Sequence, residues 1–196
     1  MARILLVEKA PLRSDLMQQR ERLPQAERLV AEKKIADALS ARAVMERWLQ
    51  VAVFLPWRGE PDLMSTWRAW HARGLRLALP VVVAQDAPLV MQEWQPGGAL
   101  IRDAMGLQVP DQTQTLACDT WVIPCVGVDV NGGRLGAGKG FYDRTAAALR
   151  MTHTDLPRLI GVCFDYALSS HSFAEPHDLR LDACVTELGW HDFRAG

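Results

Sequence analysis

The stretch GGRLGAGKGFYDR, which runs from Gly132 to Arg144, combines bare backbone with positive charge. Its thirteen positions hold five glycines, two arginines and one lysine, between an apolar run and a helix-forming one. Three of the glycines alternate with other residues, so the backbone can approach a ligand closely and turn N–H groups toward it. Arg134 and Lys139 add cations. This pattern predicts a local binding site for a polyphosphate.

Two familiar phosphate-binding motifs do not account for this stretch. The Walker A pattern G-x-x-x-x-G-K-[ST] is matched from Gly133 to Lys139, but Gly140 stands where the magnesium-binding hydroxyl belongs. The dinucleotide pattern G-x-G-x-x-G also fails, because the third glycine comes one residue early. A simple turn between a strand and a helix is the structural alternative, although such a turn needs only one or two glycines and no flanking cations.

The rest of the chain supplies elements that could position such a loop. Residues 9–48 are charged and alanine-rich, with apolar residues at helical spacing and Pro24 as a break between helices. Downstream, strand-like and helix-like runs alternate, which predicts an α/β fold: a three-layer, Rossmann-like, mostly parallel sheet flanked by helices, with N-terminal helices. In such sheets, ligands collect where strands end and helices begin. The expected strands are 51–56, 75–83, 89–94, 120–130, 158–164 and 183–187. The expected later helices are 61–74 and 141–151. Residues 96–119 and 169–178 are expected to be loops, the first with a turn or two of helix.

The composition is typical of one globular domain. With 196 residues, of which 49% are apolar and 23% charged, we expect a single domain spanning residues 1–196. The net charge of −1 gives no basis for binding nucleic acid, and no apolar run approaches the roughly 20 residues of a membrane span. The opening MARILLV is too short for a signal peptide, so we expect a cytoplasmic protein. Four widely spaced cysteines, without a C-x-x-C pair, indicate core residues rather than a zinc site or a disulfide framework.

The glycine-rich stretch lies within a longer signature. VIPCVGVDVNGGRLGAGKGFYDR closely resembles the signature of the 5-formyltetrahydrofolate cyclo-ligase family, also called methenyltetrahydrofolate synthetases, with the pattern P-G-x-x-[FV]-D…R-L-G-x-G-x-G-[FY]-Y-D. Three more blocks resemble the family in the correct order: KAPLR from Lys9, GEPD from Gly59 and EPHDLRLDACVTE from Glu175. Together, the four blocks span almost the whole chain.

The chain also departs from the family pattern. Cys125 stands where the family usually has glycine, in the turn before Val126. Pro11 lies inside the N-terminal block, where it would fit best in a first helical turn. Residues 97–118 are only loosely similar. These departures concern the shape of the folate pocket more than the chemistry.

The resemblance implies an ATP-dependent enzyme that closes 5-formyltetrahydrofolate to 5,10-methenyltetrahydrofolate and releases ADP and phosphate. In that reaction, the formyl oxygen first takes the γ-phosphoryl group, N10 of the folate then attacks the activated carbon, and phosphate leaves. Phosphoryl transfer depends chiefly on positioning and on cations around the moving charge. The implied cofactor is Mg²⁺, with ATP as co-substrate. The implied partners are small molecules, including folates with or without a polyglutamate tail, and we expect a monomer.

The resemblance also implies roles for individual residues. The implied catalytic residues are Lys139, Arg134 and Tyr142. The implied ATP-binding residues are Lys9, Arg13, Arg134, Leu135, Gly136, Ala137, Gly138, Lys139, Gly140, Phe141 and Tyr142. The implied folate-binding residues are Arg13, Glu60 and Tyr142, and the implied magnesium ligands are Asp143 and Asp182. His177 is a candidate for ordering a nearby loop.

Several of these residues have structural alternatives. Lys9 and Arg13 could belong to a solvated helix face. Asp143 could cap a helix, and Tyr142 could be a core tyrosine with a satisfied hydroxyl.

Other protein classes are also open at this stage. One alternative is a catalytically idle nucleotide- or folate-binding paralogue, which would be expected to lack clamp or metal residues that this chain retains. Another is a sugar-phosphate isomerase or CoA transferase with a similar sheet. That class needs a carboxylate or thiol beside the phosphate loop, and Cys125 is the only nearby thiol in the sequence.

Overall fold

The computed structural model describes residues 8–103, 105–152, 155–175 and 178–193 of the chain. His177 therefore lies outside the described residues. The helices are α1 (Lys9–Arg22), α2 (Gln25–Met45), α3 (Met64–Ala72) and α4 (Phe141–Met151), with a short 3₁₀ helix η1 (Asp165–Ala167). The strands are β1 (Gln50–Ala52), β2 (Arg76–Val81), β3 (Val90–Trp94), β4 (Leu100–Arg102), β5 (Gln108–Pro110), β6 (Thr120–Pro124), β7 (Gly127–Asp129), β8 (Arg134–Leu135), β9 (Arg158–Val162), β10 (Leu168–Ser169), β11 (Ala183–Thr186) and β12 (Gly189–Asp192).

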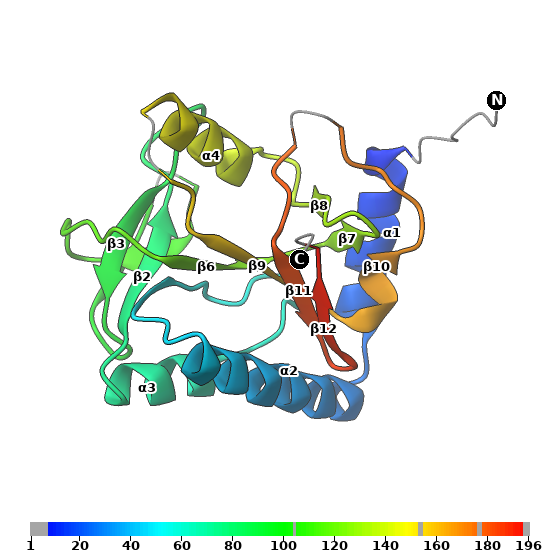
Figure 1. The fold of residues 1–196 in the computed structure, drawn as a ribbon, viewed down its shortest axis with the longest axis horizontal. Helices are drawn as coiled ribbons and strands as arrows, with labels where there is room; N and C mark the ends of the chain where they lie inside the picture. Colours follow the sequence, from blue (N-terminus) through cyan, green and yellow to red (C-terminus); the bar gives the residue numbers. More distant parts are fainter. Residues whose placement is uncertain (1–7, 104, 153–154, 176–177, 194–196) are drawn as a thin grey trace.

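Seven strands form the central sheet, in the order β12-β11-β9-β6-β1-β2-β3 (Figure 1). The five inner strands are parallel to one another, whereas the edge strands β3 and β12 pair antiparallel. From β1 the chain winds outward through β2 to β3, then returns to β6 on the other side of β1 and winds outward again. The winding direction thus reverses between β1 and β6, which is the topological switch point of a Rossmann-like sheet. The expected fold class is confirmed.

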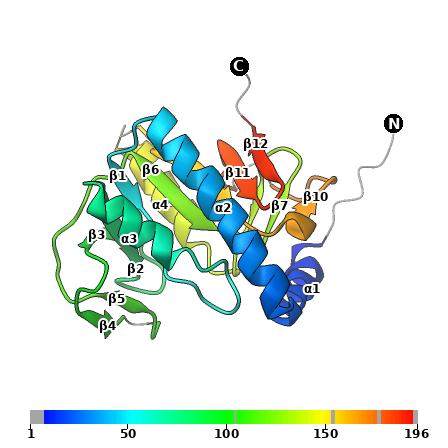
Figure 2. The ribbon, with the colours of Figure 1, turned by 90° about the horizontal axis from the view of Figure 1, so that it is seen from below.

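Alternate strand residues face two separate layers of the core. Val51 and Val53 pack into the layer that includes Trp67 and Trp70 of α3, whereas Ala52 between them packs into the layer that includes Ala146 of α4. Helices α2 and α3 therefore cover one face of the sheet and α4 covers the other (Figures 1 and 2). Burial on both faces is typical of a parallel sheet and explains why its strands read as continuous apolar runs.

A smaller sheet, in the order β10-β7-β8, lies beside helix α1 (Figure 1). Its apolar cluster includes Leu135 of β8 and Phe173, and Leu12, Leu16 and Met17 of α1 pack against it. Helix α1 is therefore docked on the strand that leads into the glycine-rich loop. Because the loop follows directly from β8, this packing places α1 beside it.

The carboxylate of Asp129 holds the small sheet together. One oxygen accepts hydrogen bonds from the backbone N–H groups of Asn131 and Gly133, at 2.9 and 2.7 Å. The other accepts bonds of 2.9–3.0 Å from Ser172 Oγ and from the N–H groups of Phe173 and Ala174. Burial alone would raise the pKa of Asp129, but these backbone hydrogen bonds lower it below its ordinary value. Asp129 thus ties the β7–β8 turn to a segment that lies about forty residues further along the chain.

Three expectations about individual elements were wrong. The described residues of 96–119 contain the β4–β5 hairpin where a turn of helix was expected. The expected strand 120–130 is broken at Cys125, and its halves belong to different sheets. A further strand, β12, follows β11 through a tight turn at Gly189, whose φ of 135° suits glycine. The hairpin and β12 depend on pairing with other strands, which local sequence does not reveal.

Among the described residues, no helix is both long and apolar enough to cross a membrane.

We predict that Asp129→Asn destabilises the fold at neutral pH by about 2–4 kcal/mol, because an amide cannot accept the five hydrogen bonds made to the carboxylate. Since folding lowers the pKa of Asp129, its contribution is complete above the ordinary value and is lost as the pH falls through the folded-state value. Urea unfolding at several pH values measures this difference. It should shrink in acid, and the exposed Asp15→Asn on α1 is the matched control. Equal stability of Asp129→Asn and wild type at pH 7 would contradict the assignment.

Candidate active site

Two loops meet at the switch point of the sheet. Residues 53–63 follow β1 and lead to α3, and residues 125–140 follow β6 and lead, through the small sheet, to α4. Because β1 and β6 are parallel neighbours, both loops leave the same edge of the sheet. Glu60 lies on the first loop and the glycine-rich segment on the second. The fold therefore places two distant sequence blocks where an α/β sheet binds its ligands.

The glycine-rich loop is open to solvent. Ala137, Gly138 and Lys139 are exposed, and the backbone of Gly138 has a φ of 92°. The nearest atoms to a Cβ built at Gly138 belong to the Arg13 guanidinium, 3.5 Å away. Gly140 caps the N-terminus of α4 without a side-chain hydrogen bond, which leaves backbone N–H groups for an anion. The loop is thus available to a ligand and is not packed shut.

Arg13 and Arg134 bring positive charge to this loop from two elements. The Nε of Arg13, on α1, donates a 2.8 Å hydrogen bond to the carbonyl of Gly136. Arg134 on β8 is 9% exposed, and its Nη2 donates to Asp143 Oδ2 at 2.9 Å. A Cβ at position 136 would displace the Arg134 guanidinium from its present position, so glycine at 136 leaves room for the Arg134–Asp143 contact. The two arginines therefore flank the loop in fixed positions.

Lys9 is engaged with two carboxylates. Its Nζ lies 2.8 Å from Glu175 Oε2 and 2.5 Å from Asp178 Oδ2. Burial would lower the pKa of Lys9, but the hydrogen bonds to these carboxylates raise it above its ordinary value. The ammonium group therefore stays charged and ties the start of α1 to the segment before β11. Phosphate binding by Lys9 would require this contact to be exchanged or shared.

The two aspartates expected to bind magnesium have separate hydrogen-bond partners. Asp143 lies in the first turn of α4, and its second oxygen accepts a 3.0 Å bond from the N–H of Leu179. Asp182 directly precedes β11, and its carboxylate accepts a 2.7 Å bond from the N–H of Leu159. Within the described residues, no group of three or more His, Cys, Asp or Glu side chains could hold a metal ion.

Asp143 nevertheless suits a magnesium ion that is shared with phosphate. Mg²⁺ prefers oxygen ligands, retains several waters and is commonly held by one or two carboxylates together with substrate phosphates. Asp143 is an oriented carboxylate at the rim of the open loop. Most ligands other than Asp143 would therefore come from phosphate and water.

Glu60 is a largely buried carboxylate at the end of a turn whose other residues are mostly exposed. Its side chain is 12% exposed, Oε2 accepts a 3.1 Å bond from the N–H of Trp57, and Oε1 lies 3.8 Å from Arg20 Nη1. Burial raises the pKa of Glu60 to about 7, against the smaller lowering effects of Arg20 and the Trp57 N–H. Glu60 can therefore change protonation state near neutral pH.

Tyr142, in the first turn of α4, lies close enough to both Arg134 and Glu60 for their charges to affect its pKa. Its ring lies 5.3 Å from the Arg134 guanidinium carbon and 6.1 Å from the ring of Trp121, measured to ring centroids. Burial raises the pKa of Tyr142 far above its ordinary value; Arg134 lowers it, and the Glu60 carboxylate raises it further. The hydroxyl therefore stays protonated, and the charge of Glu60 acts on this side of the site.

Sequence reasoning missed Asp129 and Arg20. Asp129 belongs to the quoted signature, but the sequence did not reveal its structural role. Arg20 gave no signal, because it lies among other charged residues of a helical pattern. Its burial, with 3% of its surface exposed, depends on the turn that packs against α1.

A model of the 5-formyltetrahydrofolate cyclo-ligase family matches residues 6–187 of this chain. The chain belongs to this family. The Mycolicibacterium smegmatis member, named 5-formyltetrahydrofolate cyclo-ligase, is 31% identical over 187 residues, covering 91% of this chain and 93% of that protein. The Escherichia coli K12 protein of the same name is 32% identical over 146 residues, covering 69% and 76%.

Solved structures also resemble this member of the cyclo-ligase family. The 5,10-methenyltetrahydrofolate synthetase of Aquifex aeolicus has a TM-score of 0.79 at 25% identity and covers 96% of this chain and 94% of its own. That of Mycoplasma pneumoniae has a TM-score of 0.72 at 23% identity, covers 92% and 99%, and shows the same fold. The family, the enzyme class and the fold expected from the sequence are confirmed; the roles of individual residues remain predictions.

We predict that Glu60→Gln changes how stability depends on pH. Folding raises the pKa of Glu60 from 4.5 to about 7. The contribution of Glu60 to the free energy of unfolding is therefore fully present below pH 4.5 and is lost as the pH rises through about 7. The free energy of unfolding of wild type minus that of Glu60→Gln should fall by about 2 kcal/mol between pH 5 and pH 8. Denaturant titrations measure it, with the exposed Glu27→Gln on α2 as control. Parallel pH curves for wild type and Glu60→Gln would refute the buried-carboxylate interpretation.

Proposed function

We propose that this protein converts 5-formyltetrahydrofolate to 5,10-methenyltetrahydrofolate at the expense of ATP, with Mg²⁺ as cofactor. The observation that carries the proposal is the meeting of an open, arginine-flanked glycine loop and a buried carboxylate at one edge of the sheet. The glycine loop suits a triphosphate, and the Glu60 carboxylate suits the N–H groups of a pterin. Family membership supports the same reaction.

The glycine-rich loop would bind the triphosphate of ATP. Backbone N–H groups around Gly138 and Gly140 would donate to phosphate oxygens, as the start of α4 favours an anion. Arg13 is oriented by the Gly136 carbonyl, and the exposed Lys139 extends from the same loop. The remaining nucleotide contacts inferred from the family, by Lys9, Leu135, Ala137, Phe141 and Tyr142, belong to this proposal.

Cations and a bound Mg²⁺ would stabilise the transferring phosphoryl group. In the reaction, the formyl oxygen bonds to the γ-phosphorus while the bond to ADP breaks. Arg134 and Lys139 would offset the charge that develops on the phosphoryl oxygens. Mg²⁺ would supply further charge neutralisation, held by Asp143 and, as inferred from the family, Asp182.

The folate would lie toward the loop that follows β1. Ionised Glu60 can accept hydrogen bonds from the N–H groups of the pterin and so orient the formyl group toward ATP. After phosphorylation, folate N10 attacks the activated formyl carbon, and the C–O bond to phosphate breaks. Tyr142, which stays protonated, is available as a hydrogen-bond donor between the two substrates.

The alternatives have less support. An idle paralogue would be expected to lack clamp or metal residues, yet Arg134, Lys139 and Asp143 are present, and the first and last are bonded to each other. A sugar-phosphate or CoA enzyme would need a reactive nucleophile here, but Cys125 is buried and its pKa is raised to about 12, mainly by burial. We also infer a single-domain, monomeric, cytoplasmic protein with small-molecule substrates and without nucleic-acid or membrane partners.

The direct test mixes purified protein with 5-formyltetrahydrofolate, ATP and Mg²⁺ and follows the long-wavelength absorbance of the methenyl product. ADP and phosphate should form in equal amounts with that product. Omission of ATP or of Mg²⁺ should abolish the signal. Failure of the complete mixture to form the methenyl product would refute the proposed function.

We predict that Lys139→Gln lowers kcat/KM for ATP by about 100-fold, because it removes a cation from the developing phosphoryl charge. The exposed position of Lys139 means that the thermal midpoint should stay close to that of wild type. The exposed Arg150→Gln at the end of α4 is the matched control and should retain full activity. Unchanged turnover in Lys139→Gln would remove this residue from the phosphate site.

A further inference from the structure

Arginines from the N-terminal helices hold the turn that carries Glu60. Arg20 of α1 donates from Nε to the carbonyl of Arg58 at 3.0 Å, and Arg28 of α2 donates from Nη1 to the carbonyl of Gly59 at 2.5 Å. The turn has positive φ at both Arg58 and Gly59, 45° and 77°. A left-handed arginine is uncommon and needs support from its surroundings. The two helices therefore fix the backbone on which Glu60 is mounted.

Arg20 also lies within ion-pair distance of the Glu60 carboxylate. It is 3% exposed, and its Nη1 lies 3.8 Å from Glu60 Oε1. Among the described residues, Nη1 has no hydrogen-bond partner. An unpaired buried guanidinium N–H is costly, and Glu60 is the acceptor within reach. Ionised Glu60, more than neutral Glu60, compensates Arg20.

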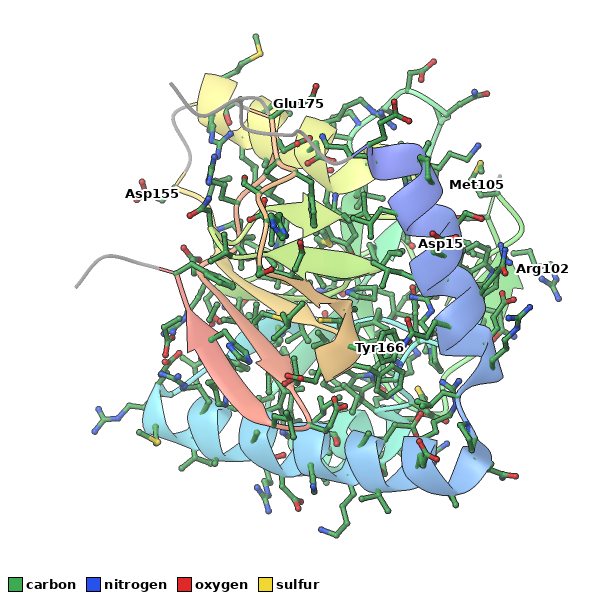
Figure 3. All side chains as sticks on the ribbon, turned by 90° about the vertical axis from the view of Figure 1, so that its right-hand side faces the viewer. Asp15, Arg102, Met105, Asp155, Tyr166 and Glu175 are labelled. Atoms are coloured by element: carbon green, nitrogen blue, oxygen red, sulfur yellow. The ribbon has the colours of Figure 1, made fainter. Side chains whose placement is uncertain are left out.

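Two further cations lie at the turn: Arg28, which donates to the Gly59 carbonyl, and Arg58, which is exposed and paired with Glu21. The remaining groups around Glu60 are neutral. Its own turn contributes the N–H of Trp57. The protonated Tyr142 and the thiol of Cys125 belong to the elements that follow β6, and the charge of Glu60 raises the pKa of both. Among the described residues, Arg20 is the cation that acts on Glu60 and favours its charged form. Arg20 also acts on Tyr166 of η1, which is labelled in Figure 3: burial raises the pKa of Tyr166, and the charge of Arg20 lowers it.

We propose that Arg20 is a positioning residue for folate recognition: it fixes the Trp57–Glu60 turn and favours the ionised form of Glu60, so that the carboxylate can accept hydrogen bonds from the pterin. This inference rests on the proposed function. The pyrimidine ring of a pterin presents N3–H and the 2-amino group side by side, and a carboxylate matches both donors whereas a protonated carboxyl group does not. Arg20 thus acts through Glu60 without reaching the substrate itself.

The test compares Arg20→Gln with wild type across a range of pH. Loss of the cation should raise the pKa of Glu60, so the acidic limb of kcat/KM for 5-formyltetrahydrofolate should move up by about one pH unit. At pH 7, the ionised fraction of Glu60 should fall from about one half to about one tenth, so KM for the folate should rise about fivefold, while KM for ATP changes less than twofold. The defect should largely disappear at pH 9, whereas the defect of Glu60→Gln should persist at every pH. A folded Arg20→Gln with an unshifted limb would overturn the proposal.

Two further variants keep the test decisive. Arg20→Met removes the charge at this buried position and should show the same upward shift as Arg20→Gln. If Arg20→Gln does not fold, an unshifted limb in folded Arg20→Met overturns the proposal. Arg22→Gln, on the exposed face of the same turn of α1, is the matched control and should behave like wild type.

A stability titration separates this inference from the proposed function. The measured quantity is the effect of Glu60→Gln on the free energy of unfolding, followed as a function of pH. The pH midpoint of this effect should be higher in the Arg20→Gln background than in the wild-type background. An upward shift together with no turnover in the wild type would support the coupling of Arg20 to Glu60 and refute the proposed function. Identical midpoints would overturn the coupling itself.

Discussion

The buried Asp129 carboxylate is the constraint on which the nucleotide side of the site depends. Its five hydrogen bonds fix both the β7–β8 turn and residues 172–174. That turn feeds directly into Arg134 and the open loop, and the second segment leads toward the partners of Lys9. A single buried charge, fully compensated by donors, therefore sets the geometry of a loop that must itself stay open.

The sheet topology brings opposite electrostatic environments together. On the β6 side, exposed backbone and arginines favour an anion, and Arg134 is held in place by Asp143. On the β1 side, burial disfavours the charge on Glu60, and Arg20 partly restores it. A triphosphate needs the first environment and a pterin edge needs the second. Because β1 and β6 are neighbours at the switch point, neither loop has to reach far to meet the other.

The sequence predicted those elements whose patterns are local. Helix α4 begins and ends where its pattern indicated, and Pro24 separates α1 from α2. The apolar inner strands were found because burial on both faces leaves continuous apolar runs. The β4–β5 hairpin and β12 were missed, because their short strands form only through pairing with other segments. The break at Cys125 was missed for a related reason: adjoining strands of similar composition entered different sheets.

By itself, the sequence determined the family, the fold class and the chemical types available to the site, since glycine spacing and cation content are properties of a short contiguous segment. Only the tertiary structure decided which of those groups are buried and what they contact. It left Lys139 exposed, paired Lys9 with carboxylates, buried Glu60 and placed Arg20 within ion-pair distance of it. The physical reason is that charge regulation depends on desolvation and on neighbours distant in sequence, and both are fixed only when the helices and loops pack around the sheet.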